Sequence, residues 1–453
     1  MKKIKILFTI LTINILITST SAISSFTAKE IQTDEHPGIN ILIKDSLINK
    51  IKYPNLLPFP EIPGAVGERP LLLILIEFSN VPHYPLHERD YFDSILFGGN
   101  PSVRDYYNEV SYGKFTFVKA GILGWYTSSC NGLKEKSRDE IVREAFRSAS
   151  KDRSFDFASY DVNGDHILTT DELTILICTS GYSSEHPMGA YHNWRLRGMK
   201  ILTWDGMILS GEHSALQEWQ PWMVYAHELG HSLLLPDLYD YTRKSRGIGV
   251  YDLMGLGNLD GTNGHQFSAW SKIKLGWIEP TIVTKDGFYV VHDSETHPEA
   301  YILEDSSHPE KEYFLVENRF RGNSYDNGIS PLPDEGIAIY HIDDSVPKFF
   351  TPWTWFPWVN SNELHKMVDI ECADSFTSHF KNADDLDKNK NNGDGNDLWD
   401  VTAYGFNSTS IPCNSRWYDG SSNNIGIYVL SEPGRNMTVY FSVNGTTPLE
   451  MMK

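Results

Sequence analysis

The chain has 453 residues, of which 40% are hydrophobic and 13% aromatic, so it is long and apolar enough for at least two folded domains. Its 39 Lys and Arg residues against 59 Asp and Glu residues give a formal net charge of −20. A field of that sign repels phosphate, which argues against general binding to nucleic acid or to anionic membranes.

Residues 1–22 predict a secretory signal peptide. Lysines at the start of the chain precede an apolar run at residues 6–17, and small residues at 20–22 offer a cleavage site. Polar residues interrupt the run, which is also too short to favour a membrane anchor, and no later segment is long and apolar enough to span a bilayer. We therefore expect an extracellular protein without stable membrane insertion.

Residues 23–67 are polar and then rich in proline, which predicts a pro-segment and linker. The segment contains no cysteine, so a cysteine latch over a metal is excluded. A carboxylate latch from Asp34 or Asp45 and a plain disordered tail stay open as alternatives.

Residues 68–278 mix helical and strand-like patterns, which predicts one α+β domain. The apolar run at residues 71–78 follows a proline and predicts a buried central strand. Further strands are expected at 114–120 and 173–179, and weaker ones at 200–204 and 207–210. Helices are expected at 86–97, 102–111, 136–150, 218–235 and 267–275.

Residues 279–445 predict a β-rich, sandwich-like module, and residues 446–453 a tail. Short strand-like runs are separated here by Gly, Pro, Asn and Asp, as in sandwich folds. That some of these strands complete the preceding domain stays open. The runs lie at 289–292, 313–317, 337–342, 425–430 and 437–443.

The four cysteines are Cys130, Cys178, Cys372 and Cys413, and export permits disulfides. We prefer the pair Cys372 and Cys413, because both fall in the loop-rich C-terminal half. Cys178 lies in an apolar strand-like run and is expected to be a buried free thiol.

The clearest chemical signal is an H-E-x-x-H motif on an apolar helical pattern. His227 and His231 are four residues apart, so on a helix both imidazoles leave from one face, as two ligands of one tetrahedral zinc ion must. Glu228 can reach a water in the open position of such a metal. Pro236 ends the helix, and after the turn Asp237 can swing back as the third ligand. A chance motif on a metal-free helix is the alternative.

Together with this motif, several stretches resemble the immune-inhibitor-A-like secreted metallopeptidases of the metzincin clan. The resemblance implies a metzincin-like catalytic domain with His227, His231 and Asp237 as zinc ligands and Glu228 as general base. It also implies a methionine turn beneath the metal, which residues 252–255 match, with Met254 as an apolar floor. The stretches lie at 104–107, 110–113, 227–240, 267–272, 275–277 and 336–343.

One residue departs from the family pattern, because Leu234 stands where the family has glycine. A Cβ makes a left-handed backbone costly by about 1–2 kcal/mol, so the turn is either made differently or strained. Asp240 is the alternative third ligand, and Tyr239 or Tyr241 is expected to line the site.

Residues 161–172 resemble an EF-hand loop, with oxygen-bearing side chains at calcium-ligand spacing and His166 where glycine is usual. A structural calcium ion is expected here, also because the family appears calcium-stabilised, and a solvated turn is the alternative. The candidate ligands are Asp161, Asn163, Asp165, Thr169 and Glu172.

Two further clusters have open interpretations. An acidic cluster predicts either a second calcium site or an acidic loop; its members are Asp384, Asp385, Asp387, Asp394, Asn396 and Asp397. An aromatic patch predicts either a substrate or partner surface or burial between domains; its members are Trp353, Trp355, Phe356 and Trp358.

We therefore expect a secreted, monomeric, zinc-dependent endopeptidase that acts on proteins or peptides, with calcium as a structural ion. Zinc lowers the pKa of water, and Glu228 takes the proton as the water attacks the peptide carbonyl. The alternatives are an inactive, calcium-stabilised peptidase-like module that binds surfaces or proteins, and a zinc amidase that acts on cell-wall peptides.

Overall fold

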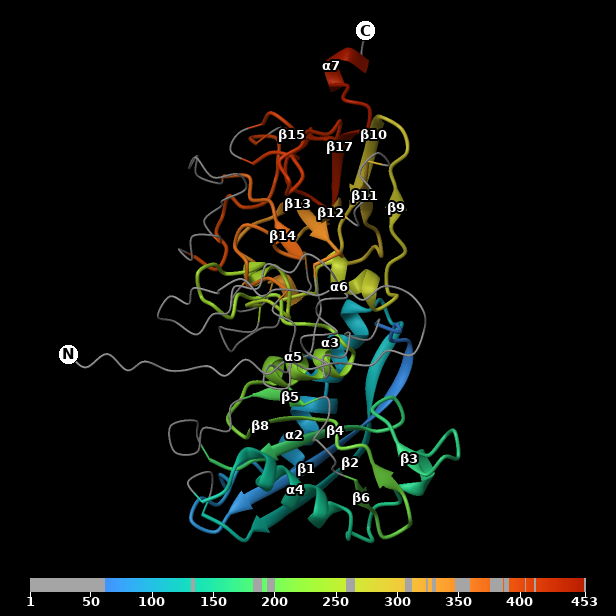
Figure 1. Cartoon of the computed structure of the whole chain (residues 1–453), viewed down its shortest axis with the longest axis vertical. Helices are drawn as coiled ribbons and strands as arrows, with labels where there is room; N and C mark the ends of the chain where they lie inside the picture. The colour runs from blue at the N-terminus through green and yellow to red at the C-terminus, as the bar shows by residue number, and fades with distance from the viewer. Residues whose placement is uncertain are drawn as a thin grey trace, which may run out of the picture. The chain divides into compact units, whose positions relative to one another are not determined.

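The computed structural model describes residues 62–451 apart from short internal segments, and Figure 1 shows its elements. The segments outside the description are 132–134, 182–189, 194–199, 258–264, 306–311, 323–324, 328–330, 347–358, 375–385, 387–390, 404 and 411–412. Several expectations fall outside the described residues: the signal peptide, most of the pro-segment, both latch carboxylates, the aromatic patch, and Asp384, Asp385 and Asp387.

A five-stranded sheet of order β2-β1-β4-β8-β5 supports the first part of the described chain. The apolar run at residues 71–76 forms the middle of β1 and is fully buried, as expected for a central strand. Four strands pair in parallel and the edge strand β5 pairs antiparallel with β8. The strands are β1 (Gly67–Phe78), β2 (Phe115–Ser128), β4 (Thr174–Thr179), β8 (His213–Gln217) and β5 (Tyr191–Asn193).

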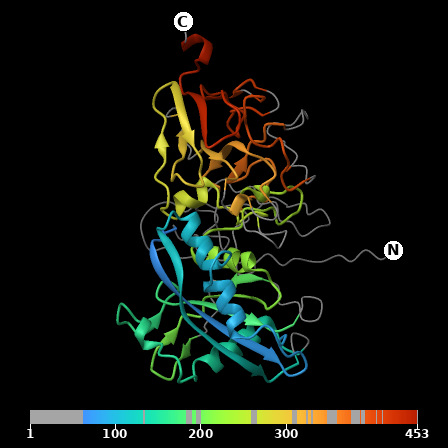
Figure 2. The ribbon, with the colours of Figure 1, turned by 180° about the vertical axis from the view of Figure 1, so that it is seen from behind.

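Successive residues of β1 enter different cores, because neighbouring side chains of a strand point to opposite faces. The odd-numbered leucines from Leu71 to Leu75 pack with α2, α3 and α5, and the even-numbered residues from Leu72 to Ile76 pack with α4. Helices therefore cover both faces of the sheet (Figure 1, and from behind Figure 2). They are α2 (Arg89–Phe97), α3 (Val103–Val110), α4 (Arg138–Ala149) and α5 (Trp222–Ser232).

Local signals set the helix ends. The Ser102 side chain accepts a hydrogen bond from the Asp105 backbone N–H at the start of α3, and Ser137 with Glu140 forms a capping box at the start of α4. Helix α5 begins directly after Pro221, so it is shorter than the range expected from the sequence.

A small sheet of order β3-β7-β6 follows the 3-10 helix η1 (Ala158–Tyr160). It joins β3 (Ile167–Leu168), which belongs to the EF-hand-like loop, to β7 (Ile208–Leu209) and β6 (Ile201–Leu202).

Two sheets make up the later part of the chain, after η2 (Gly249–Tyr251) and α6 (Ala269–Lys274). The first has the order β14-β13-β12-β11-β9, and the second β10-β17-β16-β15. Their strands are β9 (Thr281–Ile282), β10 (Gly287–His292), β11 (Tyr301–Leu303), β12 (Glu312–Arg319), β13 (Gly336–Asp343), β14 (Val368–Ile370), β15 (Gly405–Asn407), β16 (Gly426–Val429) and β17 (Asn436–Ser442). The remaining elements are η3 (Tyr325–Asn327) and α7 (Pro448–Met451).

Strands β12 and β13 are buried on both faces of their sheet. Phe314 and Ile339 pack in a core to which both C-terminal sheets contribute, whereas Leu315 and Tyr340 pack in the core that also contains Met254. That second core runs from Ala65 to Leu398 and so crosses residue 278. The architecture is thus mixed α and β, and the domain boundary at 278 stays a prediction.

The expected disulfide is wrong, because Cys372 and Cys413 are both buried and are not joined in a disulfide. Both side chains lie in apolar cores, but in different ones, so proximity in the loop-rich half of the sequence did not bring them together. Cys178 is a buried free thiol, as expected, and burial raises its pKa. In the described part of the chain, no helix reaches the length and apolarity that a membrane span requires.

Candidate metal centre

Helix α5 places His227 and His231 on one face, with ring centroids 4.9 Å apart and both side chains buried. In each ring Nδ1 is hydrogen-bonded to a backbone carbonyl at 2.8 Å, that of Leu253 for His227 and that of Leu235 for His231. A carbonyl only accepts hydrogen bonds, so each Nδ1 donates and each Nε2 is left to bind a cation.

The turn after α5 brings a carboxylate back to these two rings. Asp237 Oδ1 lies 3.1 Å from His227 Nε2 and 3.3 Å from His231 Nε2. Leu234 makes the turn with φ of 71°, so the family glycine position keeps its left-handed backbone and the Cβ strain is tolerated. Asp240 is not part of this group, since its carboxylate accepts backbone hydrogen bonds from Thr242 and from residues 244–245.

The three side chains interact strongly because they are buried. Burial alone would lower the pKa of His227, but its hydrogen bond to Asp237 and the charge of that carboxylate raise the pKa to about 9. Burial would raise the pKa of Asp237, but the charge of His231 and hydrogen bonds to both rings hold it well below its usual range. Asp237 thus takes the position of an anionic ligand shared by both imidazoles.

Glu228 follows His227 on the same helix and is buried. Burial raises the pKa of its carboxyl to about 7, against the opposing charges of His231 and His227. Among the described residues, no hydrogen-bond partner contacts its buried Oε2 atom. A carboxyl that titrates near neutral pH and has one unpaired oxygen is suited to exchange protons with a bound reactant.

The expected methionine turn lies beneath α5. The Met254 side chain is fully buried, and its sulfur lies so close to Gly230 that a Cβ there would come within 2.6 Å of it. Asp252 holds the turn by accepting hydrogen bonds from the Met254 N–H at 2.7 Å and the Ser268 hydroxyl at 2.6 Å. Since Leu253 in this turn is the carbonyl partner of His227, the turn also orients one ring of the site.

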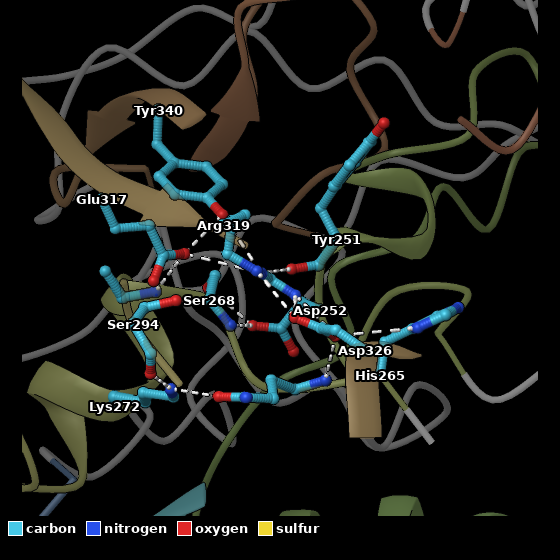
Figure 3. Close-up of polar contacts among 12 residues, drawn as sticks. Tyr251, Asp252, His265, Ser268, Lys272, Ser294, Glu317, Arg319, Asp326 and Tyr340 are labelled. Carbon is cyan, nitrogen blue, oxygen red and sulfur yellow. Dashed lines mark hydrogen bonds and ion pairs between the residues drawn. The ribbon is translucent and has the colours of Figure 1, made fainter. Parts of the chain in front are cut away.

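A buried ion-pair network connects this turn to the C-terminal strands (Figure 3). Arg319 on β12 donates to the backbone carbonyl of Tyr251 at 2.8 Å and forms a bidentate pair with Asp326, with Nη2–oxygen distances of 2.8 and 3.0 Å. Glu317 lies 3.5 Å from Arg319 Nη1 and accepts the Tyr340 hydroxyl at 2.7 Å. Sequence reasoning missed this network; the signal available was an acidic and a basic residue, Glu317 and Arg319, two apart at the end of an apolar run.

Two neighbours complete the surroundings of the site. The Tyr241 hydroxyl donates to Asp237 Oδ2, so this tyrosine lines the site as expected, and the Tyr239 ring lies 6.4 Å from that of His227. His192 on the edge strand β5 has its ring 6.2 Å from that of His231, which sequence reasoning also missed. Its Nδ1 lies 2.7 Å from the Ser214 hydroxyl, which donates to the Glu228 carbonyl at 2.8 Å.

The EF-hand-like loop is folded by its own oxygens. The Asp161 carboxylate accepts from the Gly164 and His166 N–H groups, and Glu172 accepts from the Thr169 hydroxyl at 2.9 Å. Asn163 and Asp165 each accept from the N–H two residues on. His166 takes the left-handed backbone of the usual glycine, with φ of 63°. Calcium at this loop stays a prediction.

The residues present fit a bound cation at the histidine pair. Two nitrogens and a carboxylate oxygen lie within 4.8 Å of one another, all three side chains are buried, and both Nε2 atoms face the same carboxylate. Two imidazoles and one carboxylate are a donor set of catalytic zinc. It differs from the oxygen-only set that calcium or magnesium prefers.

Comparison with known proteins supports this chemistry. Residues 194–283 match the family described as Immune inhibitor A peptidase M6, catalytic domain. The pre-pro-metalloprotease PrtV of Vibrio cholerae serotype O1 is 25% identical over 268 residues, which cover 45% of this chain and 29% of that protein. Immune inhibitor A of Bacillus thuringiensis subsp. alesti is 23% identical over 273 residues, which cover 46% of this chain and 40% of that protein. The matched region thus spans less than half of either relative.

Proposed function

Since this chain resembles the immune-inhibitor-A metallopeptidases through its matched catalytic region, we propose that it is a secreted, zinc-dependent endopeptidase that hydrolyses peptide bonds of proteins. One observation supports the proposal most strongly. The Nε2 atoms of His227 and His231 meet the Asp237 carboxylate, and the buried, partly unpaired Glu228 lies next to them on α5.

In this proposal His227, His231 and Asp237 hold the zinc ion. When bound, the ion supplies Lewis-acid chemistry that activates water and polarises the peptide carbonyl. The carbonyls of Leu253 and Leu235 fix the ring orientations before any ligand arrives. The Tyr241 hydroxyl keeps Asp237 in place from the other side of that carboxylate.

Glu228 moves the protons. As a carboxylate it accepts a proton from the attacking water, and as an acid it donates that proton to the departing amine nitrogen. Its pKa of about 7 suits both steps near neutral pH, because neither protonation state is strongly disfavoured. Burial of the site keeps bulk water from competing for this proton.

The wider proposal includes a metzincin-like catalytic region with Met254 as the floor of the site, followed by a sandwich-like C-terminal module. The shared core between the two C-terminal sheets supports the second part. Secretion is supported by the signal-peptide pattern of residues 1–22, and structural calcium by the oxygen ligands of residues 161–172.

The test pairs metal analysis with a casein hydrolysis assay on the mature protein. We expect one zinc per chain, activity that a chelator removes and zinc restores, and a Glu228→Gln variant that keeps its zinc but loses about 10²–10⁴-fold in rate. Glu109→Gln is the matched control, because burial also raises the pKa of Glu109 to about 7 but this residue lies on α3. Its activity should persist.

Full casein hydrolysis by Glu228→Gln would remove that residue from the mechanism. A wild-type protein that takes up no zinc would refute the metal site. Cleavage of cell-wall peptides without cleavage of casein would replace the endopeptidase by an amidase that uses the same residues.

A further inference from the structure

A second group of converging carboxylates lies outside the histidine site. Asp374, Asp394 and Asp397 each bring one carboxylate oxygen within 4.8 Å of the other two. The sequence grouped Asp394 and Asp397 with acidic neighbours, but Asp374 joins them only through the fold. Backbone pairing explains this, since the Ala373 N–H donates to the Asp397 carbonyl at 2.8 Å.

Asp397 provides an independent sign of a missing ligand. Its side chain is 0% exposed, and its Oδ1 atom is buried without a hydrogen-bond partner among the described residues. The other oxygen, Oδ2, is satisfied by the Tyr251 hydroxyl and the Asp394 N–H, each at 2.6 Å. A buried carboxylate oxygen left without a partner costs free energy, so a positive ligand is expected at this point.

No ion pair joins Asp394 or Asp397 to a described Lys, Arg or His. Burial and the nearby charge of Asp394 raise the pKa of Asp397 to about 6, although hydrogen bonds from the Tyr251 hydroxyl and the Asp394 N–H oppose the shift. Like charges held together in this way are relieved when a cation binds between them.

We propose that Asp374, Asp394 and Asp397 form a calcium site that fastens the segment after β14 and the turn at residues 391–397 to the loop before the methionine turn. The converging ligands are all carboxylates, which favours a hard cation over zinc. Calcium suits the site better than magnesium, since it accepts irregular oxygen geometries and completes its shell with carbonyls and water.

A calcium ion at these carboxylates would help to hold Tyr251, which precedes the methionine turn. The Val250 N–H donates to the Asn392 carbonyl at 2.8 Å, and the Tyr251 hydroxyl reaches Asp397. Figure 3 shows that the Tyr251 carbonyl faces Arg319, whereas its ring points away from the Arg319 cluster. Tyr251 is therefore held at both ends, and calcium at Asp397 fixes the end that Arg319 does not reach.

Calcium titration by calorimetry tests the proposal, with zinc-loaded protein so that the histidine site is occupied. Asp394→Asn should lose one equivalent of calcium, or bind it at least about tenfold more weakly, and should lose part of the rise in Tm that calcium gives the wild type. Asp400→Asn is the matched control, because its carboxylate accepts from Thr402 and is outside the group. It should bind calcium like the wild type.

Asp161→Asn separates this site from the EF-hand-like loop, because it should leave the equivalent that depends on Asp394 intact. Asp374→Asn provides a second variant if Asp394→Asn does not fold, as judged by circular dichroism. The proposal is overturned if the folded variant binds as much calcium as the wild type with the same affinity. It is also overturned if the wild type binds none at about 1 mM calcium. Neither result bears on zinc or on casein hydrolysis, so the proposed function stands or falls separately.

Discussion

Replacement of Arg319 by methionine tests the buried network that supports the methionine turn. Methionine fills a similar volume but removes the guanidinium, which is 0% exposed. Asp326 then loses its bidentate partner, although the Gln266 N–H at 2.9 Å still donates to it. The Tyr251 carbonyl loses a 2.8 Å hydrogen bond at the same time.

The expected cost follows from these contacts. Breaking a buried ion pair by removing one partner costs about 3–5 kcal/mol, because the other charge stays buried. That loss is a large share of a typical unfolding free energy of about 5–15 kcal/mol. The double variant Arg319→Met/Asp326→Leu removes both charges and should be more stable than the single variant by about 1–3 kcal/mol.

Urea unfolding followed by tryptophan fluorescence measures these differences. Arg321→Met is the matched control, since its pair with Glu335 at 3.1 Å is partly exposed, at 32% and 23%, and should be worth at most about 1 kcal/mol. The reasoning fails if Arg319→Met costs no more than Arg321→Met, or if the double variant is less stable than Arg319→Met alone.

Three further predictions follow from single features. Leu234→Gly relieves about 1–2 kcal/mol of strain from the left-handed backbone, but glycine loses more conformational entropy on folding and removes a partly buried side chain. The unfolding free energy should therefore stay within about 1 kcal/mol of the wild type. Leu233→Gly removes a buried side chain and should lower the unfolding free energy by at least about 2 kcal/mol. If urea unfolding showed the same loss for Leu234→Gly and Leu233→Gly, the strain argument would be contradicted. Burial would lower the pKa of His341, but its hydrogen bonds to Glu312 and Glu371 raise it to about 9. The resulting stabilisation, up to about 3 kcal/mol, is complete below about pH 6.5 and lost as pH rises through 9. Melting scans from pH 6 to 10 should therefore show a decline that is shallower in His341→Gln, in which His227 keeps its own raised pKa; parallel curves would argue against a contribution from His341. If calcium binds the EF-hand-like loop, EGTA should lower the Tm of the wild type more than that of Asp161→Asn. Equal decreases in Tm for the two proteins would mean that no calcium binds this loop.

The sequence predicted those parts of the fold and site that depend on local pattern. The continuous apolar run at residues 71–76 became the central strand, and the spacing of His227 and His231 placed both rings on one helix face. A strained left-handed turn at Leu234 was one of the two alternatives that the sequence offered, because the resembled family has glycine at that position.

What the sequence did not predict depends on contacts between distant residues. Asp374 reaches Asp397 only because their backbones pair, and nothing in the spacing of the acidic residues indicated it. The pairing of Cys372 with Cys413 was wrong for the same reason, since two cysteines in one loop-rich region enter different cores. Arg319 was overlooked because its partners come from a distant turn and a separate 3-10 helix.

Strands β12 and β13 are buried on both faces of their sheet, and this limits how the protein can be shortened or recombined. A fragment that stops at residue 278 would lose Leu315 and Tyr340 from the core that also contains Met254, and would open this core to water. Exchange of C-terminal segments with other chains should therefore succeed only at a junction beyond this sheet.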